Sequence, residues 1–296
     1  MSGSGGLFAA IAGVGLAHSL GGLARLTSGD RAPETPTPPD TAELAAALPG
    51  VSLRRIPRYA RMALLAALRA LDDAGWRQEE RRDSALVIGT AYSGVQMSMD
   101  FMDSILDDGP RLSSPTAFSH AVNNMGAGLL SLLLHMQGPC LTVSQFELSF
   151  AGAVCAAATL LHAGRARRVL VGAVDEVDER FTRCCPQLQK TGFPQTEGAV
   201  FLCLELPDPE RPALRVRWER DARVLRPLFA SGCARHGEDA SCRHEHLYGH
   251  GPLAQALDTL LALHAVRNGT AAQAGCLCVA ANGARTALIE IRGAQP

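Results

Sequence analysis

Residues 148–164 are apolar around almost the whole circumference of the helix that they would form. Alanine and other small apolar residues dominate the stretch, and Gly164 ends it. A helix that lacks a polar face has to be covered on all sides, so it belongs inside the molecule. The chain is therefore expected to fold in layers around this helix.

Short apolar runs with glycine or proline at their ends predict buried strands on either side of this helix. They are residues 7–15, 85–89, 141–144, 169–174, 199–206 and 214–218, with a final strand pair at 276–281 and 287–291. Apolar residues at helical spacing predict further helices over residues 58–75, 118–136 and 253–266. The proline-rich residues 29–40 predict a surface loop. This alternation predicts an α/β fold.

The charge balance excludes some classes of partner. Twenty-eight Lys plus Arg face 29 Asp plus Glu, so no overall basic field exists, and neither nucleic acid nor an anionic membrane is an expected partner. The longest apolar stretches, residues 125–136 and 151–163, are shorter than the ~20 residues of a membrane span. Nine cysteines without paired spacing, and no basic segment ahead of the first apolar run, favour a reduced, cytoplasmic protein.

Several blocks between residues 54 and 205 occur in the order found in one family. They are Arg55-Ile56-Pro57-Arg58, Asp73-Ala74-Gly75, Ile88-Gly89-Thr90, Gly109-Pro110-Arg111, Ser114-Pro115, Asn123-Asn124, Gly138-Pro139, 141–144 and 169–176. In these blocks the chain resembles the β-ketoacyl-acyl-carrier-protein synthases. The resemblance implies a thiolase-like layered αβαβα fold with a truncated second half. It also implies a single ketosynthase-like domain over residues 1–296, with an N-terminal half at 1–206 and an abbreviated C-terminal half at 207–296.

The departures from the family concern its reactive residues. A cysteine that becomes the attacking thiolate follows the family's strand at 141–144 by three positions, and Glu147 stands there in this sequence. A carboxylate is stable at a helix N-terminus, but its acyl derivative is a mixed anhydride that water hydrolyses too readily for a growing chain. Of two family histidines only His250 matches, and Glu245 stands at the position of a lysine. Three roles are open for Glu147: an acid that stabilises the N-terminus of the helix, a carboxylate at a no longer catalytic position, or a salt-bridge acceptor for the partner. His250 is either a hydrogen-bonded residue without a catalytic role or a residual base.

Chain-length factors are members of this family that lack the cysteine and pair with an active synthase. The resemblance therefore implies a non-condensing subunit in type II polyketide or fatty-acid synthesis, possibly of polyenes. Its partners are an active ketosynthase, in a heterodimer or larger assembly, and an acyl carrier protein. The expected tunnel and interface residues are Tyr92, Val95, Met97, Met99, Phe101, Met102, Ala117, Phe118, Val143 and Ser144. Ordinary core packing is the alternative for each of them.

Two other functions remain open. One is a malonyl-carrier-protein decarboxylase or acyl-transfer variant that uses His250, against which the negative charge of Glu147 argues. The other is a carrier-protein docking scaffold. The chain is not expected to act as an enzyme on its own.

No metal or cofactor is expected. The set Cys233, His236, Cys242, His244 and His246 resembles zinc-ligand spacing but lacks a paired CxxC, so a polar surface loop is the preferred interpretation. The glycines of residues 2–6 and 13–22 do not form a GxGxxG motif followed by an acidic residue.

Overall fold

The computed structural model describes residues 7–19, 21–31, 34, 37–185, 194–220, 233–237, 244–249, 251–280 and 285–294. Within these ranges the strands form a nine-stranded sheet of order β3-β2-β4-β5-β1-β6-β9-β8-β7. The strands are β1 (Ala9–His18), β2 (Ala85–Gly89), β3 (Cys140–Val143), β4 (Arg168–Asp175), β5 (Gly198–Glu205), β6 (Ala213–Glu219), β7 (Cys233–Gly237), β8 (Gln273–Val279) and β9 (Thr286–Arg292).

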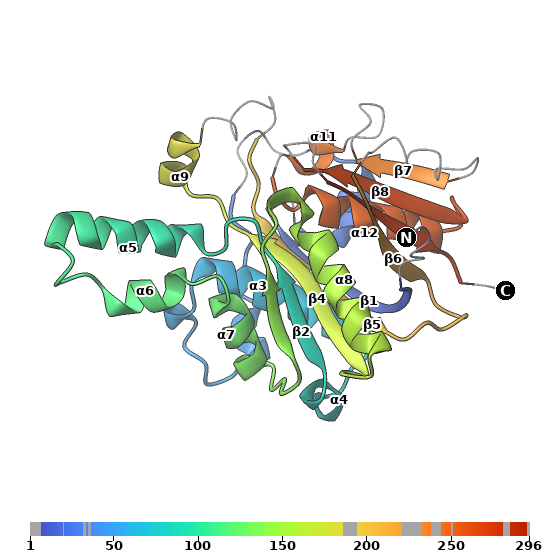
Figure 1. Ribbon diagram of the computed structural model, residues 1–296, viewed down its shortest axis with the longest axis horizontal. Coiled ribbons are helices and arrows are strands. Elements are labelled where there is room, and N and C mark those ends of the chain that lie inside the picture. Colours follow the sequence, from blue (N-terminus) through green and yellow to red (C-terminus); the bar gives the residue numbers. More distant parts are fainter. Residues whose placement is uncertain are drawn as a thin grey trace.

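Helices surround this sheet (Figure 1). They are α1 (Leu23–Ser28), α2 (Leu44–Ala47), α3 (Arg58–Asp73), α4 (Gln78–Arg82), α5 (Val95–Asp108), α6 (Pro115–Ala121), α7 (Met125–Leu133), α8 (Ser149–His162), α9 (Glu179–Cys184), α11 (Glu245–Tyr248) and α12 (Ala254–Arg267). Two short 3₁₀ turns, η1 (Leu53–Arg55) and η2 (Phe146–Leu148), complete the described elements.

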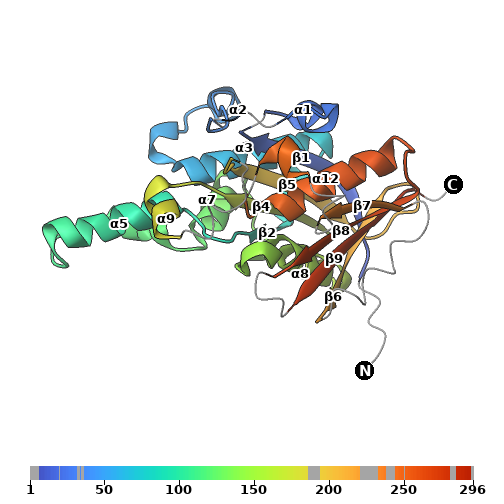
Figure 2. The same cartoon turned by 90° about the horizontal axis from the view of Figure 1, so that it is seen from above.

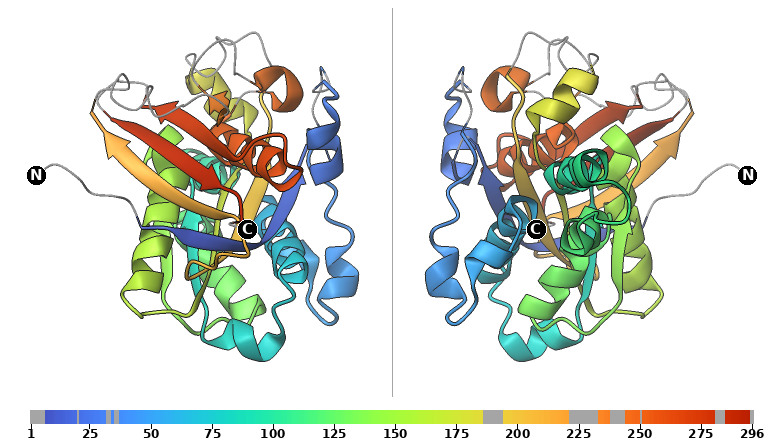
Figure 3. Two further views of the ribbon diagram at one scale, coloured as in Figure 1. Left: turned by 90° about the vertical axis from the view of Figure 1, so that its right-hand side faces the viewer. Right: turned by 90° about the vertical axis from the view of Figure 1, so that its left-hand side faces the viewer.

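The sheet has two halves. Strands β3, β2 and β4 run parallel, and β5 lies antiparallel between β4 and β1. The second half contains β6, β9, β8 and β7, and the two halves are joined through Ala9 and Ala10 of β1, which pair with Leu214 and Ala213 of β6. So short a pairing lets the second half turn away from the first, as the side views show (Figure 3).

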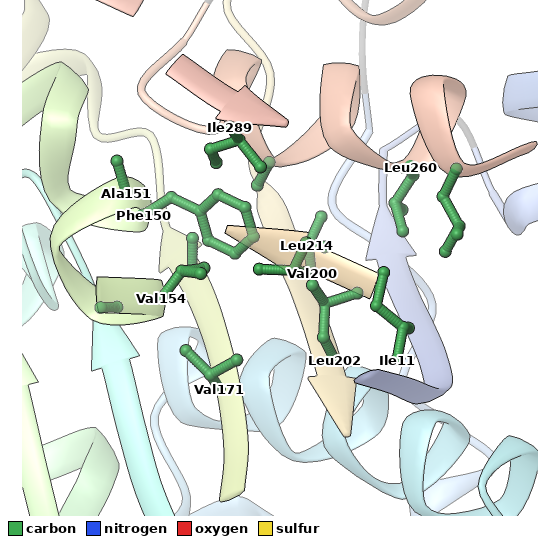
Figure 4. Close-up of a cluster of buried hydrophobic side chains, with 14 of the residues drawn as sticks. Ile11, Phe150, Ala151, Val154, Val171, Val200, Leu202, Leu214, Leu260 and Ile289 are labelled. Carbon is green, nitrogen blue, oxygen red and sulfur yellow. The ribbon is translucent and has the colours of Figure 1, made fainter. Parts of the chain in front are cut away.

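Helix α8 lies between the halves, where the apolar pattern of residues 148–164 requires it to be. It contacts β2 and β4 on one side and β6 and β9 on the other, and α12 lies in the same layer against β7, β8 and β9 (Figure 2). Phe150 of α8 is 1% exposed and packs with side chains of both sheet halves (Figure 4). A second apolar cluster joins α3 and α7 to the opposite face of the first half.

Two glycines let helices approach the sheet closely. A Cβ at Gly15 of β1 would lie 2.0 Å from the carbonyl oxygen of Ala66 in α3, and a Cβ at Gly89 of β2 would lie 2.6 Å from that of Ser149. Any larger residue would push α3 or the start of α8 away from the sheet. Gly89 therefore fixes how close α8 begins to the end of β2.

The structure confirms the predicted strands and the helices at 58–75, 148–164 and 253–266, with shifts of a few residues at their ends. The single buried helix expected over 118–136 is wrong. The chain forms α6 and α7 there, separated at Val122, which is extended, and at two asparagines, a residue type with low helix propensity. Residues 95–108, for which no element was expected, form α5, and residues 233–237 form a strand in place of the expected loop. In the part of the chain that is described, no helix has the length and apolar character needed to cross a bilayer.

Candidate functional site

The three parallel strands β3, β2 and β4 end at the same edge of the sheet. Chain segments that follow such strands meet at that edge, which is where open α/β sheets place their sites. Here the segments are the turn that leads from β3 into α8, residues 90–92 after β2, and residues 175–178 at the end of β4.

A strained turn carries Glu147 to this edge. Phe146 has a φ of +50°, a left-handed conformation that is unfavourable for a bulky residue and is typical of functional turns. Ser149 holds the turn: its hydroxyl lies 2.7 Å from the carbonyl oxygen of Phe146 and 3.0 Å from that of Thr90, and accepts from the N–H of Gln145 at 2.9 Å. Glu147 is thus held just before the N-terminus of α8, where the helix dipole favours its negative charge.

Glu147 lines a cavity of about 90 Å³. The other lining residues are Ala91, Tyr92, Asp175, Glu176, Val177, Asp178, Phe181, Thr182, Gln195, Thr196, Gly251 and Pro252. Four of the thirteen carry carboxylates, and none of these lining residues is Lys, Arg or His. The lining is thus rich in acids, although Arg58 pairs with Glu176 and Arg180 pairs with Asp178 from outside the lining. The remaining negative charge disfavours anions.

Asp175 is the most buried of these acids, at 3% exposed. Its carboxylate accepts from the hydroxyl of Thr90 at 2.9 Å and from the N–H groups of Ala91 at 3.0 Å and Tyr92 at 2.8 Å. Burial raises its pKa to about 7, although these hydrogen bonds oppose the shift. Asp175 thus holds the segment after β2 against the end of β4 and changes charge near neutral pH.

Arg58 at the start of α3 partly neutralises the acids behind the cavity. Its guanidinium lies 3.2 Å from a carboxylate oxygen of Glu197 and 3.6 Å from one of Glu176, and it donates to the carbonyl oxygen of Val177 at 2.7 Å. Burial still raises the pKa of both glutamates. Glu176 also accepts from the N–H of Gln96 in the first turn of α5 at 2.8 Å. One cation thus ties α3, β4 and β5 together at the back of the site.

Aromatic rings close the side of the cavity next to α9. The rings of Tyr92 and Phe181 lie 4.9 Å apart, and Phe146 meets Tyr92 edge-on at 6.1 Å. Partial burial, with smaller contributions from the charges of Glu147 and Asp175, raises the pKa of Tyr92 to about 12. Tyr92 is therefore a neutral hydroxyl at physiological pH.

Of the ten residues expected to form the tunnel and interface, Tyr92 lines this cavity. Val95 is buried at the start of α5, and Val143 and Ser144 lie at the end of β3. The others lie on an arm made by α5 and α6, which projects from the body of the molecule (Figure 1): Met97, Met99, Phe101, Met102, Ala117 and Phe118. The role of these residues in a tunnel stays a prediction.

His250 falls outside the described residues, as do Cys242 and the side chains of Cys233 and His236. Nδ1 of His244 lies 3.1 Å from the carboxylate of Asp258, which also accepts from the hydroxyl of Tyr248 at 2.9 Å. Within the described part of the chain, no three His, Cys, Asp or Glu side chains are grouped so that they could hold a metal ion.

The sequence reasoning did not select Asp175, Asp178 or Phe181 as site residues. A signal for the two acids was present, because Asp175-Glu176 and Asp178 follow directly after an apolar strand. Carboxylates at the end of a buried parallel strand are candidates for a site. Phe181 and Gln195 carried no local signal, since tertiary packing alone brings them to the cavity.

Residues 27–232 match the family model described as the N-terminal domain of β-ketoacyl synthases. The fold and the strained turn at the end of β3 thus belong to a ketosynthase-like protein, and the chain is a member of the β-ketoacyl synthase family. Its thiolase-like, layered α/β fold, with a second half shorter than the first, confirms the fold expected from the resemblance.

Named relatives are distant in sequence. The chain is 23% identical over 203 residues to 3-oxoacyl-[acyl-carrier-protein] synthase I of Hordeum vulgare chloroplasts, covering 60% of this chain and 42% of that protein. It is 29% identical over 125 residues to 3-oxoacyl-[acyl-carrier-protein] synthase 2 of Rhizobium meliloti, covering 41% and 30%. The chain spans less than half the length of these curated relatives.

Solved structures match the fold over almost the whole chain. The ishigamide ketosynthase/chain length factor superposes with a TM-score of 0.75 at 18% identity, covering 97% of this chain and 99% of that one. A second structure matches with a TM-score of 0.74 at 15% identity, covering 97% of this chain and 99% of that one. It is described as a type II polyketide synthase acyl-carrier protein in complex with its ketosynthase bound to the hexaketide.

Proposed function

We propose that this protein is a non-condensing, chain-length-factor-like subunit that pairs with an active ketosynthase in type II polyketide or fatty-acid synthesis. The proposal treats residues 1–296 as one ketosynthase-like unit with an abbreviated second half. The observation that supports it is Glu147: a carboxylate stands on the strained turn before α8, at the position that the resemblance gives to the family's nucleophile. Acyl transfer needs a nucleophile that forms a stable yet transferable ester or thioester, and a carboxylate forms neither.

The charges of the cavity support the same proposal. Condensation starts from an anionic malonyl unit. Four acids line the cavity, two of them paired with arginines, and no Lys, Arg or His occurs among the lining residues that the structure describes, so the cavity disfavours such a substrate. This also argues against the decarboxylase alternative, in which malonate would have to enter. Chemistry on malonyl groups is accordingly assigned to the partner.

An apolar face supports pairing with another protein. Eight large apolar side chains are exposed on α5, α6, α7, β3 and the segments next to them, and these residues define the apolar face: Met102, Leu106, Leu112, Phe118, Val122, Leu132, Leu141 and Phe146. Strand β3 is the outermost strand of the described sheet on this side, so its outer backbone groups are available for pairing. Exposed apolar surface of this kind marks interaction sites. A carrier-protein scaffold would use the same face without affecting product length.

The α5–α6 arm is proposed to reach the partner's acyl chain. The rings of Phe101 and Phe118 lie 5.4 Å apart in a tilted arrangement between the two helices, and three methionines on α5 add adaptable apolar surface. An arm that closes the end of a tunnel would set the length of the product.

The test is co-expression with a type II ketosynthase and its carrier protein. We expect a stable complex, no covalent acylation of the isolated chain, and a shorter product when Phe101→Trp fills the tunnel end. The control Leu206→Trp, at an exposed position outside the apolar face, should leave the product length unchanged. A complex whose product length is the same with Phe101→Trp would reduce the protein to a scaffold, and acylation of the isolated chain would refute the proposal.

A further inference from the structure

Residues 90–96 join the end of β2 to the first turn of α5, and they define the hinge segment. The segment carries Tyr92, which lines the cavity, and it leads directly into the α5–α6 arm (Figure 1). Ser93, near its centre, has a φ of +61°, a left-handed conformation that costs energy for a residue other than glycine. Such a conformation persists only where surrounding contacts hold it.

Asp175 at the end of β4 holds the first part of the hinge segment. Its carboxylate accepts from the N–H groups of Ala91 at 3.0 Å and Tyr92 at 2.8 Å. It also accepts from the hydroxyl of Thr90 at 2.9 Å, and that hydroxyl oxygen accepts from the N–H of Ser93 at 2.8 Å. One carboxylate therefore holds three successive backbone donors, two of them directly and the third through Thr90.

Glu176, the next residue of the chain, holds the other end of the hinge segment. Its carboxylate accepts from the N–H of Gln96 at 2.8 Å. Asp175 and Glu176 are only 3% and 5% exposed, so both carboxylates are shielded from water while the segment is docked on them. Both acids also line the cavity, so a displacement of Ala91 and Tyr92 would open them to water from that side.

Burial controls the charge of this pair of acids. It raises the pKa of Asp175 to about 7 and also raises the pKa of Glu176, although hydrogen bonds oppose both shifts. The charged and titratable groups that face the pair from the described elements are Arg58 and Tyr59 of α3, Tyr92 of the hinge segment, Glu147 of η2, Asp178 after β4 and Glu197 before β5.

Only one of these facing groups is a cation. Arg58 pairs with Glu176 and Glu197, and the structure shows no ion pair between it and Asp175. The raised pKa of Tyr59 and of Tyr92 keeps both phenols neutral. A charged Asp175 therefore gains more from contact with water than from its surroundings in the docked conformation.

We propose that the hinge segment is released from β4 when Asp175 and Glu176 lose their protons, so that Tyr92 leaves the cavity wall and the first turn of α5 becomes mobile. Burial penalises the charged carboxylates and not the neutral acids, so proton loss favours the open conformation and proton uptake favours the docked one. The opening is local, because β2 and α8 keep their own contacts. This regulation of the candidate site goes beyond the proposed function and does not depend on a ketosynthase.

Hydrogen exchange of single backbone amides in the isolated full chain, at pH 6 and at pH 8, tests the proposal. Observed rates divided by intrinsic rates give the equilibrium constant for opening at each pH. An acid whose pKa changes from about 7 when docked to its ordinary 3.8 when open makes opening about tenfold more favourable at pH 8 than at pH 6. We expect this increase at the amides of Ala91, Tyr92 and Ser93.

Other amides of the same chain are the internal controls. The N–H of Gln137 donates to the carbonyl oxygen of Arg82, which does not titrate, so its opening should be the same at both pH values. The amides of β2 should open far less often than those of Ala91 and Tyr92 at each pH, since we expect them to exchange only when the whole fold opens.

Two variants separate Asp175 from the other acids. Asp175→Asn keeps an acceptor for the N–H groups of the hinge segment and does not titrate, so the tenfold increase should be lost. Asp107→Asn, at an exposed position on α5, should keep it.

Several outcomes would overturn the proposal. They are equal opening of the hinge segment at both pH values in the unmodified chain, less opening at pH 8, and a tenfold increase that persists in Asp175→Asn. Opening of Tyr92 no more frequent than that of the β2 amides would also overturn it, because the segment would then open only by global unfolding. The measurement contains no partner protein, so none of these outcomes bears on pairing with a ketosynthase.

Discussion

Asp175 shows how a single buried acid links the site to pH. Its pKa is about 7 in the folded protein and 3.8 in the reference state, so its stabilising contribution is full below pH 3.8 and is lost as the pH rises through 7. Between pH 6 and pH 8 this group alone lowers the free energy of unfolding by about 1.4 kcal/mol. Urea titrations should show that Asp175→Asn flattens this slope, because the amide keeps an acceptor for the N–H donors and has no charge.

The exposed Asp107 on α5 provides the control for that measurement. Asp107→Asn should leave the slope between pH 6 and pH 8 as it is in the unmodified protein. Glu176 and Glu197 have raised pKa values as well, so part of the slope should persist in Asp175→Asn. A slope that is identical in both variants would mean that Asp175 is ionised in the folded protein at pH 6.

His18 acts in the opposite direction. Burial lowers its pKa from 6.5 to about 4, so the folded protein holds the neutral ring, and the stability that this provides above pH 6.5 is lost as the pH falls towards 4. The full loss amounts to roughly 3 kcal/mol. We expect His18→Gln to remove most of the decline in the unfolding free energy between pH 6.5 and pH 4.5. A decline of unchanged steepness would contradict this account.

At the scale of elements, local sequence patterns predicted α3, α8 and α12. Each of these helices has a long run of apolar residues, which covers almost the whole circumference in α8, and such a run indicates burial without any knowledge of the fold. Helix α5 escaped prediction because contacts distant in sequence hold it. Glu176 binds the N–H of Gln96, and Arg180 of α9 bridges to Asp100 and Asp103 on α5 and to Asp178 at the start of its own helix. Likewise the position of Glu147 could be predicted by its spacing from β3, whereas the acids around it come from β4 and follow from the fold.

The ion pairs of Arg180 give a prediction for the arm. Arg180→Met would leave three neighbouring carboxylates without their shared cation, so α5 should detach from α9 more often. We expect faster amide hydrogen exchange over residues 95–108 and a global loss of stability below about 1 kcal/mol, since the pairs are partly exposed. The control is Arg183→Met on the same helix. Arg183 forms no ion pair with a described residue, so this variant should leave the exchange unchanged. Equal exchange in both variants would show that the arm is held by other contacts.

For the whole molecule, the layers separate the parts that stabilise the fold from the turn that carries Glu147. Stability comes from the cluster around Phe150 between the sheet halves and from the cluster beneath α3, and neither includes Glu147. A substitution at position 147 can therefore leave the fold intact. The residues of the apolar face lie outside both clusters as well, so substitutions there should have little effect on the free energy of unfolding.

This separation leads to a prediction about assembly. Leu106 and Leu132 are 74% and 70% exposed on the apolar face, so Leu106→Lys with Leu132→Lys should change the free energy of unfolding by less than about 0.5 kcal/mol per site. If a partner covers both side chains, the charges should weaken its binding at least tenfold, because each buried leucine contributes about 1.5–3 kcal/mol. Affinity for a type II ketosynthase, measured by biolayer interferometry, checks this, with Leu206→Lys as the matched exposed control. Equal affinity of the double variant and the control would place the partner on another surface.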